Sequence, residues 1–66
     1  MAIARVTKIT SSSKESFKDA VDSGLGRASQ TLRGITGLEV VSQKAKVVNG
    51  KIEEYRVTME ISFILE

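Results

Sequence analysis

The dipeptide Asn49-Gly50 is the feature that most restricts how this chain can fold, because it separates two long runs with strand character. A two-residue type I′ turn needs positive φ at both central positions, and Asn-Gly adopts this geometry readily. The runs on either side are LEVVSQKAKVV (38–48) and KIEEYRVTMEISFILE (51–66). We therefore expect these runs to form the two strands of an antiparallel hairpin.

The turn also sets the register of the hairpin, because Val48 and Lys51, which flank it, become cross-strand partners. Along a ladder without bulges, three further pairs share one face of the sheet: Arg56 with Gln43, Glu60 with Glu39, and Ser62 with Gly37. The other face of the last run carries an unbroken series of large apolar residues: Tyr55, Val57, Met59, Ile61, Phe63 and Leu65. This alternation predicts a strand with one face on a core.

The residues before the hairpin predict one strand and one helix. The run AIARVTKIT (2–10) is rich in β-branched residues, which is typical of a strand. Ser12 with Glu15 is a capping box that starts a helix, and Gly34 suits its C-terminal cap. Between these ends, apolar or small residues recur along one helical face: Phe17, Val21, Gly24 or Leu25, Ala28, Leu32 and Ile35.

The segment SGLGRASQ (23–30) has the opening of a glycine-rich phosphate loop. A dinucleotide-binding fingerprint needs a third glycine, and the position where it belongs is Ser29. The apolar stripe continues through the segment, so Gly24 and Gly26 are placed in the middle of the helix. Because glycine there costs about 1 kcal/mol relative to alanine, another backbone or a bound partner is expected close by, and tight packing is favoured over a ligand contact.

These elements predict an α+β fold with the order β-α-β-β in one domain, residues 1–66. The crossover followed by a hairpin gives a three-stranded antiparallel sheet of order 1-3-2 packed on one helix. The helix can cover only one face, and four apolar residues are assigned to the other: Val41, Val47, Ile52 and Ile64. A 66-residue chain without disulfides is marginally stable alone, so we expect copies of the chain to cover this face.

Residue content argues against several classes of function. The chain has no Cys and no His, which removes a thiol nucleophile, a Ser-His-Asp triad and the common zinc ligand sets, and no enzyme activity is expected. The charge of +2 is dispersed and aromatic residues are few, so no nucleic-acid partner is expected; an RNA-binding hairpin through Lys44, Lys46 and Lys51 is the least favoured alternative. The lack of a long apolar run predicts a cytoplasmic protein without a membrane partner.

The predicted pair of Glu39 and Glu60 is the most informative feature of the uncovered face. Like charges directly opposite each other destabilise a sheet unless they are neutralised. Arg56 or a lysine of a neighbouring subunit could pair with them, one carboxyl could hold its proton, or a hard cation such as calcium could bridge their oxygens. Two solvated carboxylates that splay apart are the simplest outcome. Glu39 and Glu60 are the candidate metal ligands.

Four segments in this order make the chain similar to the dodecin family: SSSKESFKDAV (11–21), RASQTLR (27–33), Glu39-Val40 and EYRVTMEISF (54–63). None is a catalytic motif, and the likeness covers nearly the whole chain. The resemblance implies a β-α-β-β subunit that assembles into a hollow homododecamer, with the helices outside and the strand faces lining the shell. This agrees with the self-association expected from the uncovered face.

The resemblance also implies a flavin, FMN or riboflavin, as the candidate cofactor. Flavin-binding dodecins carry a stacking tryptophan at the position of Gly37 and a hydrogen-bonding glutamine at the position of Arg56. Gln43, the predicted partner of Arg56, completes the candidate binding residues. A missing stacking ring removes about 0.5 to 1.5 kcal/mol per aromatic pair, which predicts weakened flavin binding, although Arg56 can still attract a flavin phosphate.

Two functions are consistent with these observations. The first is a small-molecule binding and storage protein, a shell that buffers its ligand without chemical turnover, with flavin as the candidate. The alternative is a structural or calcium-binding assembly of the same architecture, in which acidic residues at subunit junctions hold the ion.

Overall fold

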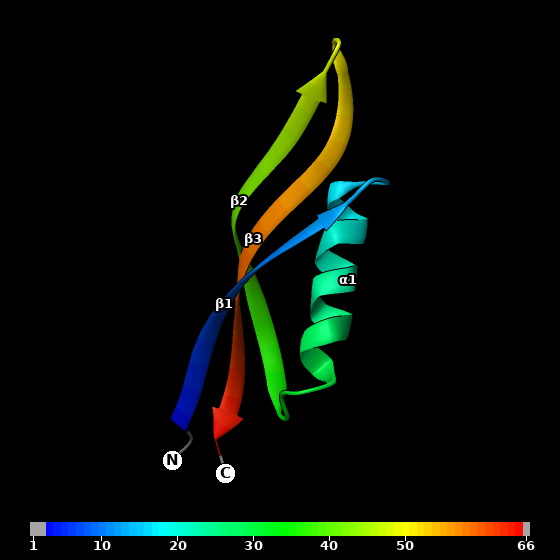
Figure 1. Ribbon diagram of the computed structural model, residues 1–66. Coiled ribbons are helices and arrows are strands. Elements are labelled where there is room, and N and C mark those ends of the chain that lie inside the picture. The colour runs from blue at the N-terminus through cyan, green and yellow to red at the C-terminus, as the bar shows by residue number, and fades with distance from the viewer. Residues whose placement is uncertain (1–2, 66) are drawn as a thin grey trace.

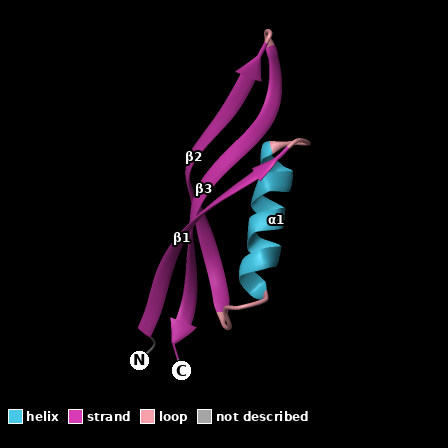
Figure 2. Ribbon diagram, in the orientation of Figure 1, coloured by secondary structure: helices cyan, strands magenta, loops and turns pink. Residues whose placement is uncertain are grey.

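The computed structural model describes residues 3–65 and shows one helix lying across one face of a twisted three-stranded sheet (Figure 1). In chain order the elements are β1 (Ile3–Ser13), α1 (Phe17–Ser29), β2 (Ile35–Val48) and β3 (Lys51–Leu65). All pairings are antiparallel and the strand order is β1-β3-β2, which confirms the predicted topology (Figure 2). The predicted strand residues Ala2 and Glu66 lie outside the described part of the chain.

The core lies between α1 and the central strand β3. Val57, Met59 and Ile61 of β3 have no exposed surface, and Ala20 and Ala28 of α1 pack with them. The alternation of β3 predicted its three core residues, and the helical spacing predicted Ala28 but missed Ala20. The core is small because one 13-residue helix covers only the middle of a 15-residue strand.

The two central glycines of α1 have different surroundings. A Cβ atom on Gly24 would lie 2.8 Å from Met59 Cε and 3.0 Å from Ser11 Cβ, so the helix and the sheet approach closely there, as predicted. A Cβ atom on Gly26 would meet nothing within 4 Å in the described part of the chain. The expectation of a close approach is therefore wrong for Gly26 within one subunit.

The helix begins four residues later than the predicted cap. Ser12 lies in β1 opposite Arg56, and the Ser16 hydroxyl accepts a hydrogen bond from the Asp19 backbone N–H at 2.9 Å as the N-cap. The Ser12–Glu15 capping box is therefore wrong. Its serine is held in the sheet because β1 pairs with β3 up to Ser13, and a strand ladder supplies backbone hydrogen bonds that a capping box would have to replace.

The helix also ends earlier than predicted, at Ser29 with Gln30 as its C-cap, and not at Gly34. Gly34 does have the positive φ expected of it, 72°, but in the connection to β2. Its carbonyl accepts a hydrogen bond from the Ile64 N–H at 2.9 Å, and a Cβ atom would lie 3.2 Å from the Ile64 carbonyl oxygen. The chain therefore leaves the helix early to turn back onto the sheet.

The hairpin turn is confirmed, and its register is confirmed only in part. Asn49 and Gly50 have φ values of 53° and 75°, as a type I′ turn requires. Three predicted pairs are present: Val48 with Lys51, Glu39 with Glu60, and Gly37 with Ser62. Between them, one irregularity at Lys46/Val47 shifts the ladder by one residue, and a second at Val40/Ser42 restores it. The intervening predicted pairs, including Arg56 with Gln43, are therefore wrong.

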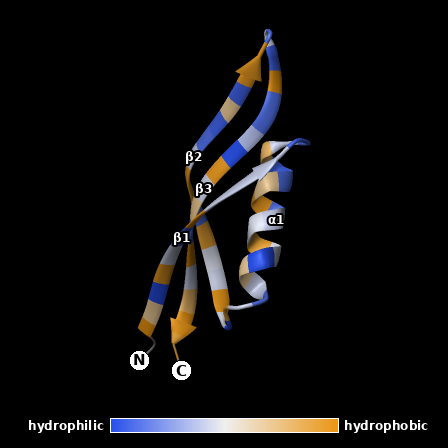
Figure 3. Cartoon of the chain, viewed as in Figure 1, coloured by the Kyte–Doolittle hydropathy of each residue, from blue (hydrophilic) through white to orange (hydrophobic). Residues whose placement is uncertain are grey.

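The hairpin projects beyond α1, and Figure 3 shows many hydrophilic residues along this projecting part. The apolar residues Val41, Val47 and Ile52 are 49%, 61% and 50% exposed, and Ile64 is half-buried. These exposures fit the prediction that one subunit leaves them uncovered. Their burial by neighbouring copies remains a prediction. No helix within residues 3–65 has the length and apolar character needed to span a membrane.

Candidate functional site

The sheet face that α1 leaves uncovered, here called the open face, is ordered as rows of cross-strand partners. Directly paired residues project to the same side of a sheet, so each row crosses all three strands. The central rows are the acidic row (Lys8, Glu60 and Glu39), the hydroxyl row (Thr10, Thr58 and Ser42) and the basic row (Ser12, Arg56 and Lys44). On β2 and β3 the acidic and basic residues are therefore separated along the strands, whereas Lys8 of β1 brings a positive charge beside Glu60.

The acidic row contains the two predicted metal ligands. Glu39 is exposed and lies directly opposite the half-buried Glu60, as predicted. Lys8 lies opposite Glu60 on its other side, and sequence reasoning missed it because no register was predicted for β1. None of the ion pairs within residues 3–65 joins these three side chains. The two carboxylates therefore remain available to a cation or to a second protein chain.

The basic row places Arg56 directly opposite Lys44. The Arg56 guanidinium donates to the carboxylate of Glu54 at 3.0 Å, so within one subunit it pairs with neither Glu39 nor Glu60. Lys46 lies 3.6 Å from Glu53. Lys44, Lys46 and Arg56, with Ala45 and Glu54, line a cleft of about 200 Å³. The site thus holds more positive charge than its own acidic residues neutralise.

The two positions that the resemblance assigned to flavin are far apart in one subunit. Gly37 is paired with Ser62, whereas Arg56 is paired with Lys44. Because Ser62 and Arg56 are six residues apart on β3, the two positions are separated by about 20 Å along the strand. A Cβ atom on Gly37 would meet nothing within 4 Å in the described residues. A single fused ring system cannot touch both positions of the same chain.

Gln43 lies on the other face of the sheet. It is paired with Val57, whose side chain is in the core, and not with Arg56. Paired residues share a face, so Gln43 cannot line the same surface as Gly37 and Arg56. Lys44, which the bulge moves opposite Arg56, takes its place on the open face.

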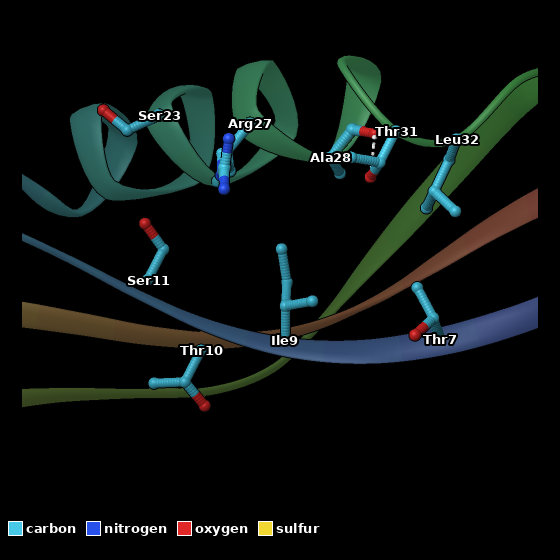
Figure 4. A pocket seen from close by; sticks show the side chains of 10 residues that line it. Thr7, Ile9, Thr10, Ser11, Ser23, Arg27, Ala28, Thr31 and Leu32 are labelled. Atoms are coloured by element: carbon cyan, nitrogen blue, oxygen red, sulfur yellow. Dashed lines mark hydrogen bonds between the residues drawn. The ribbon is translucent and has the colours of Figure 1, made fainter.

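A second cleft, which the sequence reasoning missed, lies between α1 and the edge strand β1 and has a volume of about 380 Å³ (Figure 4). Ile9 points toward the helix in this view, and Arg27 projects from α1 into the same space. Gly24 and Ala28 line the helix side, and small residues at these positions are the sequence signal that could have indicated it. Leu32 and several threonine and serine residues complete the lining of the cleft, which holds no acidic residue.

Comparison with known proteins gives a consistent result. The family model described as Dodecin matches residues 3–66. The Thermus thermophilus protein named Dodecin is 28% identical over 64 residues, which cover 97% of this chain and 93% of that protein. The solved dodecin of Streptomyces davaonensis is 37% identical, with a TM-score of 0.92 and coverage of 98% of this chain and 96% of that one. A calcium dodecin of Mycobacterium tuberculosis, described as calcium chelating, is 29% identical, with a TM-score of 0.83 and coverage of 97% and 91%.

Proposed function

Because the chain belongs to the dodecin family, we propose that it forms a homo-oligomer, a hollow dodecamer, that binds and stores a small molecule without chemical turnover. Its proposed location is the cytoplasm. The chain has neither the thiol of Cys nor the imidazole of His, which fits a binding role. The proposed binding surface is the open face, and its ligand reaches residues from more than one copy.

The separation of Gly37 from Arg56 is the observation that carries this proposal. Both positions lie on the open face, yet about 20 Å of strand separates them. A ring that stacks at Gly37 cannot also touch Arg56 of the same copy, so in this proposal the ring meets Gly37 of one copy and Arg56 of another. In this proposal the ligand binds only to assembled copies, because a lone subunit holds only half of the site.

A flavin is the proposed ligand, with FMN bound more tightly than riboflavin. The open space at Gly37 can accept a ring but offers no aromatic side chain to stack on it. Arg56 and Lys44 are partly exposed cations that suit the phosphate of FMN, and an arginine fork binds a phosphate through two parallel hydrogen bonds. Recognition would therefore depend more on charge than on stacking.

Native mass spectrometry and flavin titration test this proposal. The protein should be oligomeric at micromolar concentration, and a monomer would contradict the shared site. Gly37→Trp should tighten riboflavin binding about two- to tenfold relative to Gly37→Leu, which fills the same space without an aromatic ring. Arg56→Gln should reduce the preference for FMN over riboflavin. If Gly37→Trp and Gly37→Leu bind riboflavin equally, position 37 is not in the pocket.

Calcium binding at the acidic row is the second candidate function. It is favoured by the direct opposition of Glu39 and Glu60, and by the likeness to a solved calcium dodecin. Two carboxylates supply up to four of the six to eight oxygen ligands that calcium prefers, so water or other copies would supply the others.

Thermal unfolding with and without calcium tests the second function. Calcium should raise the melting temperature, and Glu39→Gln or Glu60→Gln should abolish this rise. Glu15→Gln, which removes an exposed acid outside the open face, should keep it. A calcium response that survives in both open-face variants would exclude the acidic row as the site.

A further inference from the structure

We propose that the cleft between α1 and the edge strand β1 binds a small anionic amphiphile, a molecule with one carboxylate and a short apolar body. Arg27 holds the carboxylate, and Ile9, Ala28 and Leu32 contact the apolar body. This inference goes beyond the proposed function, because the cleft lies on the side of the sheet that α1 covers and is complete within a single subunit.

The cleft results from the way β1 runs past α1. Near the start of the helix the two elements are held together, because the Ser13 hydroxyl donates to the Asp19 carboxylate at 2.6 Å. They also approach closely at Gly24, where a Cβ atom would lie 3.0 Å from Ser11 Cβ. Beyond this contact β1 bends away from the helix (Figures 1 and 4). Since β1 is the edge of the sheet, no other element within residues 3–65 covers the space that opens.

The size and the apolar lining of the cleft suit a small molecule. Its volume of about 380 Å³ lies near the lower end of the range of roughly 300–1,000 Å³ that is typical of small-molecule sites. Ile9 and Leu32 are half-buried, and the small side chain of Ala28 leaves room between the helix and the sheet. A ligand with an apolar body would remove the remaining surface of Ile9 and Leu32 from water, which is favourable.

Arg27 is the only charged residue within residues 3–65 that lines the cleft, and it projects into it (Figure 4). Its guanidinium donates to the neutral side-chain oxygen of Gln30 at 3.0 Å and belongs to none of the ion pairs in the described part of the chain. Lys18, on the same helix, is instead paired with Asp22 at 2.7 Å. The charge of Arg27 is therefore uncompensated, and its planar fork can bind a carboxylate through two parallel hydrogen bonds.

The lining of the cleft also selects the class of ligand. A neutral apolar molecule would leave Arg27 without a partner, and an inorganic anion would leave Ile9 and Leu32 in water. A ligand with several phosphates would need more than one cation or a helix N-terminus, whereas this cleft offers one arginine and faces the middle and end of α1. The Ser11 hydroxyl points toward the helix and takes part in none of the side-chain hydrogen bonds within residues 3–65, so it adds a neutral donor. A carboxylate with an apolar body satisfies all of these groups.

Calorimetric titration of the native protein with octanoate tests this site, with octan-1-ol and acetate as matched probes. Octanoate should bind about tenfold or more tightly than either, because it alone combines the charge with the apolar chain. Arg27→Gln should weaken octanoate binding about tenfold and leave octan-1-ol binding unchanged. Equal binding of octanoate and octan-1-ol by the wild type would contradict the inference, and so would octanoate binding that Arg27→Gln does not weaken.

Reversal of the charge separates ligand binding from a structural role of Arg27. Arg27→Glu should bind octylammonium more tightly than octanoate, whereas the wild type should show the opposite preference. An arginine in the last turn of α1 also suits the helix dipole, but loss of that contribution lowers the melting temperature without changing which probe is preferred. Arg27 is exposed, so both variants should fold, and thermal unfolding checks this. If Arg27→Glu does not prefer octylammonium, the inference is wrong.

Arg33→Gln and Arg33→Glu are matched controls, because Arg33 is an exposed arginine just after α1 that does not line this cleft. Both should bind octanoate as the wild type does, and an equal loss of binding would show that net charge, and not the cleft, is responsible.

A neighbouring copy is the other candidate occupant of the cleft. A wild type that binds no octanoate contradicts the inference, and if Arg27→Gln then also weakens assembly in native mass spectra, the cleft belongs to that copy. A monomeric wild type that binds octanoate through Arg27 would instead contradict the proposed function and support this inference.

Discussion

The two faces of the sheet are made by the same strands and have opposite characters. Under α1, Val57, Met59 and Ile61 are fully buried. On the open face, the intervening residues Thr58 and Glu60 stay half-buried among charged and hydroxyl-bearing neighbours. The comparison shows that alternate residues of β3 have two different roles. One set holds the subunit together, and the other set belongs, in our proposal, to the binding surface.

Truncation of one side chain on each face should give the largest difference in the free energy of unfolding. Ile61→Ala opens a cavity in the core and should lower the free energy of unfolding by about 2–5 kcal/mol. Ser62→Ala, the next residue on the opposite face, should change it by less than about 0.5 kcal/mol. Urea denaturation at a fixed protomer concentration measures both, because assembly couples to stability. Equal costs would show that the open face is part of the folding core.

A methyl group added at each of the two central glycines of α1 should change the stability in opposite directions. Gly24→Ala would push against Met59 and Ser11, and its overpacking should outweigh the helix-propensity gain, which leaves a net loss of up to about 2 kcal/mol. Gly26→Ala has open space and should stabilise the protein by up to about 1 kcal/mol. Thermal unfolding of the pair compares them directly. A stabilised Gly24→Ala variant would mean that the helix can move away from the sheet without loss.

Two serines distinguish the helix start from the end of β1. Ser16→Ala removes the N-cap of α1 and should cost about 1 kcal/mol. Ser12→Ala alters the open face, where the structure shows no hydrogen bond to the Ser12 hydroxyl among residues 3–65, and it should change the free energy of unfolding by no more than about 0.5 kcal/mol. Ser16→Ala should lower the urea midpoint more than Ser12→Ala does. The opposite result would indicate that Ser12, and not Ser16, caps the helix.

The smallest effect is expected on the solvent side of α1. The hydrogen bond and the negative charge of Asp22 raise the pKa of Lys18 above its ordinary value. A raised lysine pKa stabilises the folded state at pH values below the ordinary one, 10.5, and the contribution is lost as the pH rises through the raised pKa. Both side chains are mostly exposed, so Asp22→Asn should lower the melting temperature at pH 7 only slightly. The difference should vanish well above pH 10.5, and a larger difference there would reverse the sign of this coupling.

Features that depend on neighbouring residues were predictable from the sequence. Asn49-Gly50 defined the hairpin, and the alternation of β3 identified the core face. The opposition of Glu39 and Glu60 was also correct, but the two irregularities of the β2–β3 ladder that lie between the turn and Glu39 had to cancel for it to hold. The placement of Gln43, which lies between those irregularities, was wrong for the same reason. A bulge adds one residue to one strand, and the sequence carried no glycine or proline at either position to indicate it.

Features that depend on segments distant in the sequence needed the structure. The continuation of β1 to Ser13, the later helix start at Ser16 and the place of Lys8 beside Glu60 all follow from the pairing of β1 with β3. That pairing joins residues about fifty positions apart, so no local spacing sets its register.

The sequence alone determined the order of the elements, the turn and the buried face, because backbone preference and hydrophobic periodicity act over a few residues. Only the tertiary structure decided which charges share a row and how far Gly37 lies from Arg56, because cross-strand neighbours are set by hydrogen-bonded register between distant segments.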